Sequence, residues 1–333
     1  MKTTGLFLQN LSVPCACACR YCFLNAGHTA QGVPFAQGAA LARRFGEWRQ
    51  TEARESFLIG YTIGYSCDSP DLAENILLNR SLGFPGAGFL QINGIRRREP
   101  EALRQWLRTL REAGADDIDA TFFGLEESHD RFAGRRGDFA YLLEIIAAGL
   151  ELGFRVMPSF VITAENAGEL GRLISRLEAM GCAEMHGFLP DHRGRGAALD
   201  SIRPTLAETE VLPESVRRRV NWNRYRTEGD WLCGGFSPET MRQLRLSLTA
   251  ENIGRLERMP CGEIVWELEA MDDAYYAALP ALPDLARVYG NPRGERLYQQ
   301  RDLAWMWRAR WIREQGLTVA DVTDEAESGT VRR

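Results

Sequence analysis

The chain reads Pro14-Cys15-Ala16-Cys17-Ala18-Cys19-Arg20-Tyr21-Cys22-Phe23 shortly after its N-terminus. Three of these cysteines, Cys15, Cys19 and Cys22, follow the spacing C-x3-C-x2-C. Thiolates this close together can hold three irons of a cubane iron–sulfur cluster. Because the fourth iron then lacks a protein ligand, it can chelate a small molecule and pass an electron to it. The stretch therefore predicts a [4Fe–4S] cluster with one open iron.

Two other interpretations of these cysteines compete with a cluster. A structural zinc site pairs C-x2-4-C with a second ligand pair, and no C-x2-C or H-x3-H follows in this sequence. A disulfide framework suits small secreted chains more than one of 333 residues. Cys17 would be a poor fourth ligand, because its coordination would block the open iron. We therefore expect Cys17 to be a small residue in a tight loop.

The spacing, with Tyr21 just before the last cysteine, resembles the cluster loop of the radical S-adenosylmethionine (SAM) enzymes. The resemblance implies that SAM binds the open iron through its amino and carboxylate groups. It also implies that one electron cleaves SAM to a 5′-deoxyadenosyl radical, which abstracts hydrogen from a substrate. An electron donor such as flavodoxin or ferredoxin is implied as a partner.

Short apolar strands alternate with amphipathic helices from about residue 4 to residue 196, which predicts parallel βαβ units. Right-handed crossovers would wind six such units into a partial (β/α)6 TIM-like barrel, short of the eight in a closed barrel. This is also the fold that the resemblance implies. Strands are expected at 5–8, 56–65, 88–93, 118–123, 155–162 and 184–189, and helices at 37–51, 70–82, 100–113, 139–152 and 165–180.

The character of the chain changes after residue 196. We predict a barrel over residues 1–196 and a helical or irregular extension over 197–320 that covers the barrel mouth. From residue 238 onward the pattern predicts helices, including 246–259, 261–271 and 302–314. Residues 321–333 are expected to form a flexible tail.

The resemblance covers about the first 200 residues and implies further SAM contacts. Gly64-Tyr65-Ser66 stands where many relatives carry Gly-Gly-Glu-Pro, without the glutamate, and Gly64 can equally be an ordinary strand-ending glycine. Asn93-Gly94 resembles the family's Asn-Gly after strand three and can equally be a turn. Ser159 would contact the ribose or carboxylate of SAM. The residues expected to contact SAM are Tyr21, Gly64, Tyr65, Ser66, Asn93, Ser159 and, against the adenine, Leu189 or Pro190.

The segment after the fourth strand resembles the His-Asp…Gly-Phe stretch of peptide-modifying members of the family. His129 and Asp130 provide the match, while Phe123 stands where those relatives carry aspartate. We expect His129 and Asp130 to order this loop more than to act in acid–base chemistry.

Cys233 and Cys261 are the two cysteines beyond the predicted barrel. Peptide-modifying relatives often hold auxiliary clusters there, but two thiolates do not satisfy a four-ligand cluster, so we expect a single cluster. A substrate radical must be quenched, and a thiol near the barrel mouth is a good hydrogen-atom donor. Cys233, or failing that Cys261, is therefore a candidate catalytic residue. Both can equally be packing residues.

The whole composition is that of an ordinary globular chain, with 45% hydrophobic and 26% charged residues and a formal net charge of −5. We expect no nucleic-acid partner, and no run approaches the ~18 apolar residues that a membrane helix needs. Eight cysteines without a signal peptide predict a cytoplasmic protein. The substrate is expected to be a peptide or a small molecule, such as a sugar or amino-acid derivative. A non-catalytic iron–sulfur or zinc regulatory protein is the alternative.

Overall fold

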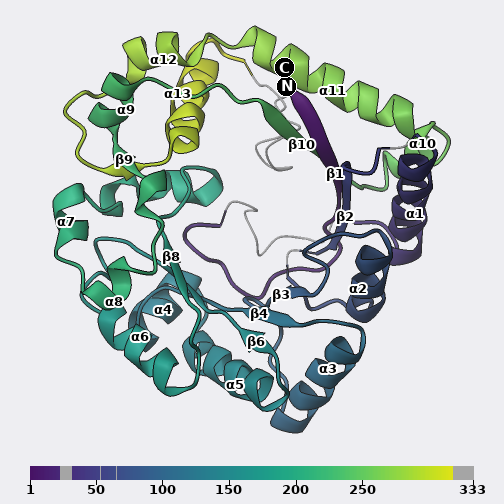
Figure 1. Ribbon diagram of the computed structural model, residues 1–333, viewed down its shortest axis with the longest axis horizontal. Coiled ribbons are helices and arrows are strands. Elements are labelled where there is room, and N and C mark those ends of the chain that lie inside the picture. The colour runs from purple at the N-terminus through teal and green to yellow at the C-terminus, as the bar shows by residue number, and fades with distance from the viewer. Residues whose placement is uncertain (23–31, 53, 65, 318–333) are drawn as a thin grey trace.

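Short parallel strands form a broad ring in the computed structural model, with helices on its outside (Figure 1). The structure describes residues 1–22, 32–52, 54–64 and 66–317. The predicted partial α/β barrel is confirmed, because the strands of the first 190 residues pair in parallel wherever they are hydrogen-bonded to one another.

The first sheet places β1 (Lys2–Asn10) between β2 (Leu58–Ile63) and β10 (Met241–Ser247), both parallel to it. Strand β10 corrects the prediction of helices from residue 238 onward. Over its first four residues the side chains alternate, as Arg242 and Leu244 are buried while Met241 and Gln243 are exposed. A burial pattern with a period of two residues is typical of a strand. The predicted extension thus returns one strand to the barrel sheet.

The remaining barrel strands form two short parallel sheets, β3–β4–β6 and β5–β7–β8. The predicted fourth and fifth strands are each divided in two, but the pieces stay paired across the break, with Asp117 beside Arg155 and Thr121 beside Ser159. The strands are β3 (Phe89–Gln91), β4 (Asp117–Asp119), β5 (Thr121–Phe122), β6 (Arg155–Val156), β7 (Ser159–Val161) and β8 (His186–Phe188).

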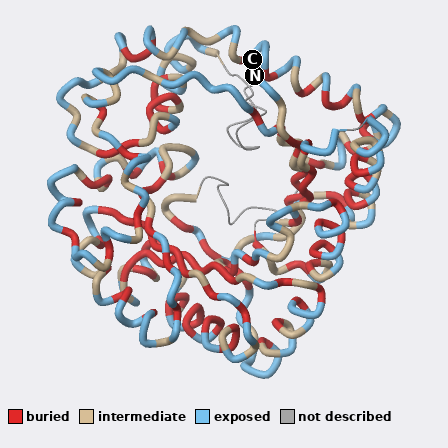
Figure 2. The backbone as a smooth tube through the Cα atoms, viewed as in Figure 1, coloured by how far each residue is buried: buried red, intermediate tan, exposed pale blue. Residues whose placement is uncertain are grey.

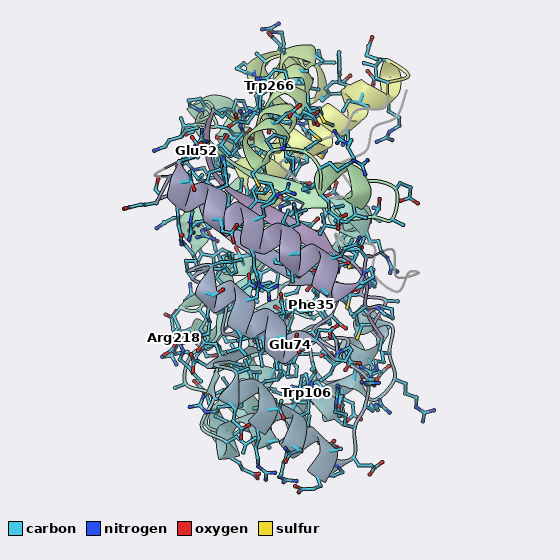
Figure 3. All side chains as sticks on the ribbon, turned by 90° about the vertical axis from the view of Figure 1, so that its right-hand side faces the viewer. Phe35, Glu52, Glu74, Trp106, Arg218 and Trp266 are labelled. Atoms are coloured by element: carbon cyan, nitrogen blue, oxygen red, sulfur yellow. The ribbon has the colours of Figure 1, made fainter. Side chains whose placement is uncertain are left out.

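Helices cover the outside of these strands, and α1, α2 and α3 stand side by side there, carrying Phe35, Glu74 and Trp106 (Figure 3). One helix, α4, was expected to be a loop. Gly134 and Gly137, both with positive φ, separate α4 from α5. The barrel helices are α1 (Phe35–Thr51), α2 (Leu72–Ser81), α3 (Pro100–Glu112), α4 (Glu126–Ala133), α5 (Asp138–Glu151) and α6 (Leu170–Ala179).

Buried segments follow the strands and the inner faces of the helices (Figure 2). One apolar cluster joins β3–β8 to α3, α5 and α6, and Ile118 and Phe160 at its centre are fully buried. A second cluster joins β1, β2 and β10 to α1 and α11, with Leu8 and Phe45 at its centre. The two clusters together pack the helices against the barrel strands.

Besides β10, the segment beyond residue 193 contains short helices, two small strands and the longer helices α11 and α13. The predicted helices 261–271 and 302–314 fall within these two, whereas 246–259 is divided between the end of β10 and the short α10. None of the described helices is long and apolar enough to cross a membrane. The predicted tail lies outside the described residues. The elements are η1 (Gly194–Ile202), α7 (Leu206–Glu210), α8 (Glu214–Arg217), η2 (Trp222–Arg224), β9 (Arg226–Thr227), α9 (Glu228–Gly234), α10 (Ile253–Leu256), α11 (Cys261–Ala278), α12 (Leu282–Tyr289), β11 (Leu297–Tyr298) and α13 (Gln300–Glu314).

Candidate functional site

The cysteine loop follows β1, so it lies where the carboxyl ends of parallel barrel strands place functional groups. Its backbone is held by segments that come from four other parts of the chain. The hydrogen bonds are Ala16 N to Gly94 O (2.8 Å), Ala18 N to Ala133 O (2.8 Å), Arg20 N to Phe132 O (3.0 Å), Arg195 N to Cys22 O (3.1 Å) and Ser66 Oγ to Pro14 O (3.0 Å).

Gly94 leaves the space that the Cys15 sulfur occupies. A Cβ on Gly94 would lie 2.0 Å from Cys15 Sγ, and the positive φ of 77° at Gly94 disfavours other residues. Asn93, expected to contact SAM, follows β3, and its side-chain amide binds the backbone of Thr121 in β5. Its Oδ1 accepts from Thr121 N at 2.7 Å and its Nδ2 donates to Thr121 O at 2.9 Å.

The thiols of the loop lie close enough to influence one another. The Cys17 N–H donates to Cys15 Sγ at 3.4 Å. The contact with the Cys17 thiol and burial raise the pKa of the Cys15 thiol, whereas the hydrogen bond from the Cys17 N–H opposes this shift. Among residues 1–22, 32–52, 54–64 and 66–317, no three His, Cys, Asp or Glu side chains already converge as metal ligands. Three thiols within eight residues are a donor set that fits an iron–sulfur cluster.

The contacts of Cys17 differ from those expected of a cluster ligand. Cys17 is 2% exposed, and its Sγ donates to Asp138 Oδ2 at 3.5 Å. The same oxygen lies 3.2 Å from His129 Nε2. Because His129 Nδ1 accepts from the Phe123 N–H, Nε2 carries the ring proton and donates to Asp138. Arg135 completes the network, 3.1 Å from Asp138 Oδ1. These contacts support the interpretation that Cys17 is a structural residue.

His129 and Asp130 order the α4–α5 segment, as expected. Asp130 accepts hydrogen bonds from the backbone N–H groups of Gly137 and Phe139. Phe123, which replaces the aspartate of the relatives, stacks on His129 with ring centres 5.1 Å apart and lies 5.2 Å from Tyr21. The segment therefore packs an aromatic layer against the cysteine loop.

A cavity of about 370 Å³ lies beside Tyr21 within the barrel. A buried polar chain runs along one wall, where Ser159 Oγ donates to Asp119 Oδ1 at 2.9 Å and lies 3.0 Å from Thr121 Oγ1. Burial raises the pKa of Asp119, although Ser159 and His186 oppose the shift. The cavity is lined by Tyr21, Gln91, Asp119, Thr121, Ser159, His186, Phe188, Asp191, Arg224, Tyr225, Gln299 and Arg301.

The structure separates the residues expected to contact SAM. Tyr21 and Ser159 line the cavity. Gly64 has a φ of 87°, and a Cβ there would lie 2.5 Å from the Cβ of Val13, so the glycine is required by the close approach of the cysteine loop. The Ser66 hydroxyl donates a hydrogen bond to Pro14 O of that loop.

The remaining expected SAM contacts are Leu189, Pro190 and Tyr65. Leu189 is fully buried in the barrel core, and Pro190 is buried as well. Packing of either residue against the adenine stays a prediction. Tyr65 lies outside the described residues.

Neither candidate hydrogen-atom donor lines the cavity beside Tyr21. Cys261 is buried at the start of α11 in the cluster with α1, where Arg44 Nε lies 3.4 Å from its sulfur. Cys233 is exposed on α9. A role of either thiol in quenching a radical stays a prediction.

Apart from Tyr21 and Ser159, the polar and charged residues of the cavity were not predicted from the sequence. The sequence did contain an indication of Asp119 and Thr121. They alternate with apolar residues along a predicted strand, and aspartate is uncommon in strands. No local pattern in the sequence indicated Arg224 and Arg301, since they come from the extension and reach the cavity only through the tertiary fold. The same holds for Asp138, whose partner Cys17 lies 121 residues away.

No protein-family model matches this chain, and no curated protein matches it. Among solved structures, Streptococcus suis SuiB bound to S-adenosylmethionine is similar, with 12% identity over 73% of this chain and 50% of that chain and a TM-score of 0.48. The protein anSMEcpe with bound AdoMet gives 15% identity over 56% and 52%, with a TM-score of 0.41. Escherichia coli coproporphyrinogen III oxidase (HemN), described as a radical SAM enzyme, gives 14% identity over 62% and 49%, with a TM-score of 0.39.

This chain thus spans about half the length of the solved structures that it resembles. Because each TM-score is below 0.5, the site is interpreted from the chain's own loop, strands and cavity.

Proposed function

We propose that this protein is a radical SAM enzyme, in which Cys15, Cys19 and Cys22 hold a [4Fe–4S] cluster and SAM binds the open iron. The observation that carries the proposal is the position of the C-x3-C-x2-C loop. It follows the first strand of a parallel partial barrel and reaches a polar cavity through Tyr21. When bound, such a cluster supplies the electron that cleaves SAM.

The residues of the cavity would position SAM and substrate and exclude water. Tyr21, with Phe123 and Phe188 around it, forms an aromatic wall next to the cysteines. Ser159 and Thr121 present hydroxyls whose orientation is fixed by Asp119. Fixed dipoles of this kind orient a polar ligand without further reorganisation.

We propose a peptide or a small molecule as substrate, with flavodoxin or ferredoxin as electron donor. The volume of about 370 Å³ is that of a small ligand site, so a peptide would insert one side chain. Arg224 and Arg301 line the cavity together with Asp119 and Asp191, and Arg301 Nη2 donates to Asp191 Oδ1 at 2.8 Å, so the lining carries both charges.

The test is anaerobic reconstitution with iron and sulfide, followed by reduction with dithionite in the presence of SAM. We expect the wild-type chain to release 5′-deoxyadenosine, measured by liquid chromatography and mass spectrometry. Cys22→Ala should release none. Cys233→Ala is the matched control, because it removes an exposed cysteine outside the motif, and it should cleave SAM like wild type. A wild-type protein that holds a cluster but never cleaves SAM would instead be the regulatory alternative.

A further inference from the structure

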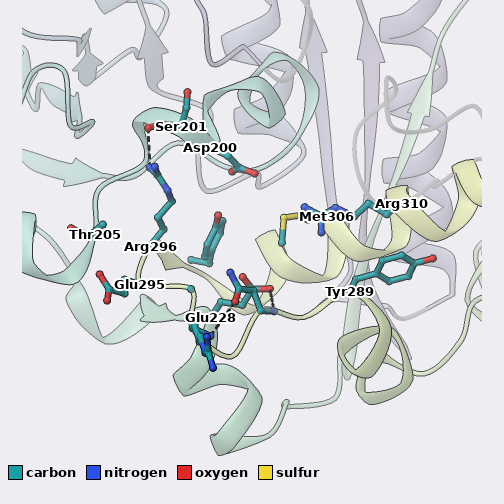
Figure 4. Close-up of a pocket in the computed structure, with 13 residues that line it drawn as sticks. Asp200, Ser201, Thr205, Glu228, Tyr289, Glu295, Arg296, Met306 and Arg310 are labelled. Atoms are coloured by element: carbon teal, nitrogen blue, oxygen red, sulfur yellow. Dashed lines mark hydrogen bonds between the residues drawn. The ribbon is translucent and has the colours of Figure 1, made fainter.

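A second pocket, of about 570 Å³, lies entirely within the segment beyond the barrel strands (Figure 4). It shares no lining residue with the cavity beside Tyr21. Its walls come from η1, α9, the loop 289–296, β11 and α13. The antiparallel pair β9–β11 and the bridge between Thr205 and Arg296 join these segments, so the pocket is built by the fold.

One wall of this pocket carries a buried carboxylate. Glu228 is 5% exposed, and its Oε1 accepts from Asn291 N at 2.9 Å. Its other oxygen lies beside Gly294, where a Cβ would be only 2.9 Å away. Burial raises the pKa of Glu228, although the Asn291 N–H, Trp307 and the charge of Arg310 oppose the shift. A positive group would stabilise the ionised form of this carboxyl.

The opposite side of the pocket carries a guanidinium. Figure 4 shows Arg310 extending from α13 on one side and Glu228 on another. Burial opposes the ionisation of Asp200, but His192, Arg203 and Arg310 together keep its pKa below the usual range. Asp200 therefore has resident partners, with His192 Nδ1 at 2.9 Å, and Glu228 is the buried carboxylate of the lining, beside the exposed Glu295.

A tyrosine adds a further polar group to the lining. Trp307, which is fully buried and does not line the pocket, lowers the pKa of Glu228. The Tyr298 ring lines the pocket, and burial raises its pKa to about 12, so its hydroxyl stays a donor.

We propose that this pocket binds a free α-amino acid, with the ammonium group on Glu228 and the carboxylate on Arg310. A simple anion would face Glu228 and Asp200, and a simple cation would face Arg310, so each would meet a charge of its own sign. A zwitterion satisfies both walls at once. The guanidinium suits a carboxylate because its planar N–H groups can bind both oxygens. The proposal goes beyond the proposed function and needs neither cluster nor reductant.

Isothermal titration calorimetry on the full chain, with each common L-amino acid in turn, tests the proposal. We expect at least one to bind. Its carboxamide, which lacks the carboxylate, and its N-acetyl derivative, which lacks the ammonium, should each bind about tenfold more weakly or worse. Absence of binding by every amino acid, or equal binding of either singly charged analogue, would overturn the proposal.

Variants locate the ligand in this pocket. Glu228→Gln keeps an oxygen for the Asn291 N–H, and Arg310→Gln changes an exposed side chain, so thermal unfolding should show both variants folded. Each should weaken binding about tenfold, with partial rescue by Arg310→Lys. The matched control is the exposed ion pair of α12, Asp284→Asn and Arg287→Gln, which should change nothing. Unchanged binding in both pocket variants would overturn the proposal.

SAM distinguishes this pocket from the barrel cavity, because SAM also carries an α-amino-acid group. We expect the amino acid to bind equally well in the presence of saturating SAM. Competition by SAM would place the amino acid in the barrel cavity and overturn the proposal. Since binding is measured without reduction, its failure leaves the test of SAM cleavage untouched.

Discussion

The cysteine loop and the pocket of the extension are built in different ways. Backbone hydrogen bonds hold the loop, and glycines such as Gly94 make room for it. The pocket of the extension is defined by charged side chains, above all Glu228 and Arg310, that four distant segments bring together. A site of the first kind tolerates little change at its backbone, whereas a site of the second kind depends on side-chain charge.

The largest effect on stability is expected from Asp138→Asn beneath the cysteine loop. The amide would turn a donor toward His129 Nε2–H and the Cys17 thiol, and it would remove the partner of Arg135. Breaking a buried charged network costs about 3 kcal/mol or more. Urea denaturation measures the loss. The control is Asp116→Asn, whose partner Arg80 is half exposed, and it should cost about 0.5 kcal/mol or less.

A pair of glycine substitutions tests the difference between the two sites directly. Gly94→Ala places a Cβ 2.0 Å from Cys15 Sγ and strains a φ of 77°, which alone costs about 1–2 kcal/mol. We expect this variant to lose most of its bound iron after reconstitution. Gly83→Ala has similar strain, with φ 68°, but no neighbour within 4 Å, and should keep its iron.

Gly294→Ala, in the pocket of the extension, should be milder than Gly94→Ala. Its Cβ would lie 2.9 Å from Glu228 Oε2 and 3.2 Å from Asn291 O, less close than the 2.0 Å at Gly94, and its φ is not in the left-handed region. If Gly294→Ala destabilised the chain as much as Gly94→Ala, the distinction between the two sites would be wrong.

Cys17→Ala should have a smaller effect, since it removes one weak donor to Asp138 and leaves a small space. We expect a loss of about 1 kcal/mol in stability, with cluster content and SAM cleavage retained. Loss of the cluster in this variant would show that Cys17 is a ligand.

The smallest effect concerns pH. Burial raises the pKa of Asp119 in the folded chain, so the folded state binds this proton more tightly than the unfolded state. Its contribution to stability is therefore full below the unfolded pKa of about 4 and is lost as pH rises through the folded pKa. The free energy of unfolding, measured from acid to neutral pH, should fall more steeply with rising pH in wild type than in Asp119→Asn. Parallel profiles would contradict the shift.

The comparison also explains what could be predicted from the sequence. Cys15, Cys19 and Cys22 lie within eight residues, and the strands of the barrel show their own periodicity, so both were predictable. Strand β10 was missed because its seven residues sit among helices, and Arg242 interrupts its apolar face. The cavity arginines and the pair Glu228–Arg310 were not predictable, since no local pattern records which distant side chains the fold brings together.

The central claim is that the three motif cysteines hold a cluster whose fourth iron is open to SAM. Electron paramagnetic resonance of the reduced, reconstituted protein, recorded with and without SAM, tests it most directly. We predict the signal of one [4Fe–4S] cluster, with about four irons per chain, that changes when SAM is added and is absent from Cys15→Ala, Cys19→Ala and Cys22→Ala. A signal that SAM leaves unchanged, or that persists without these cysteines, would contradict the claim.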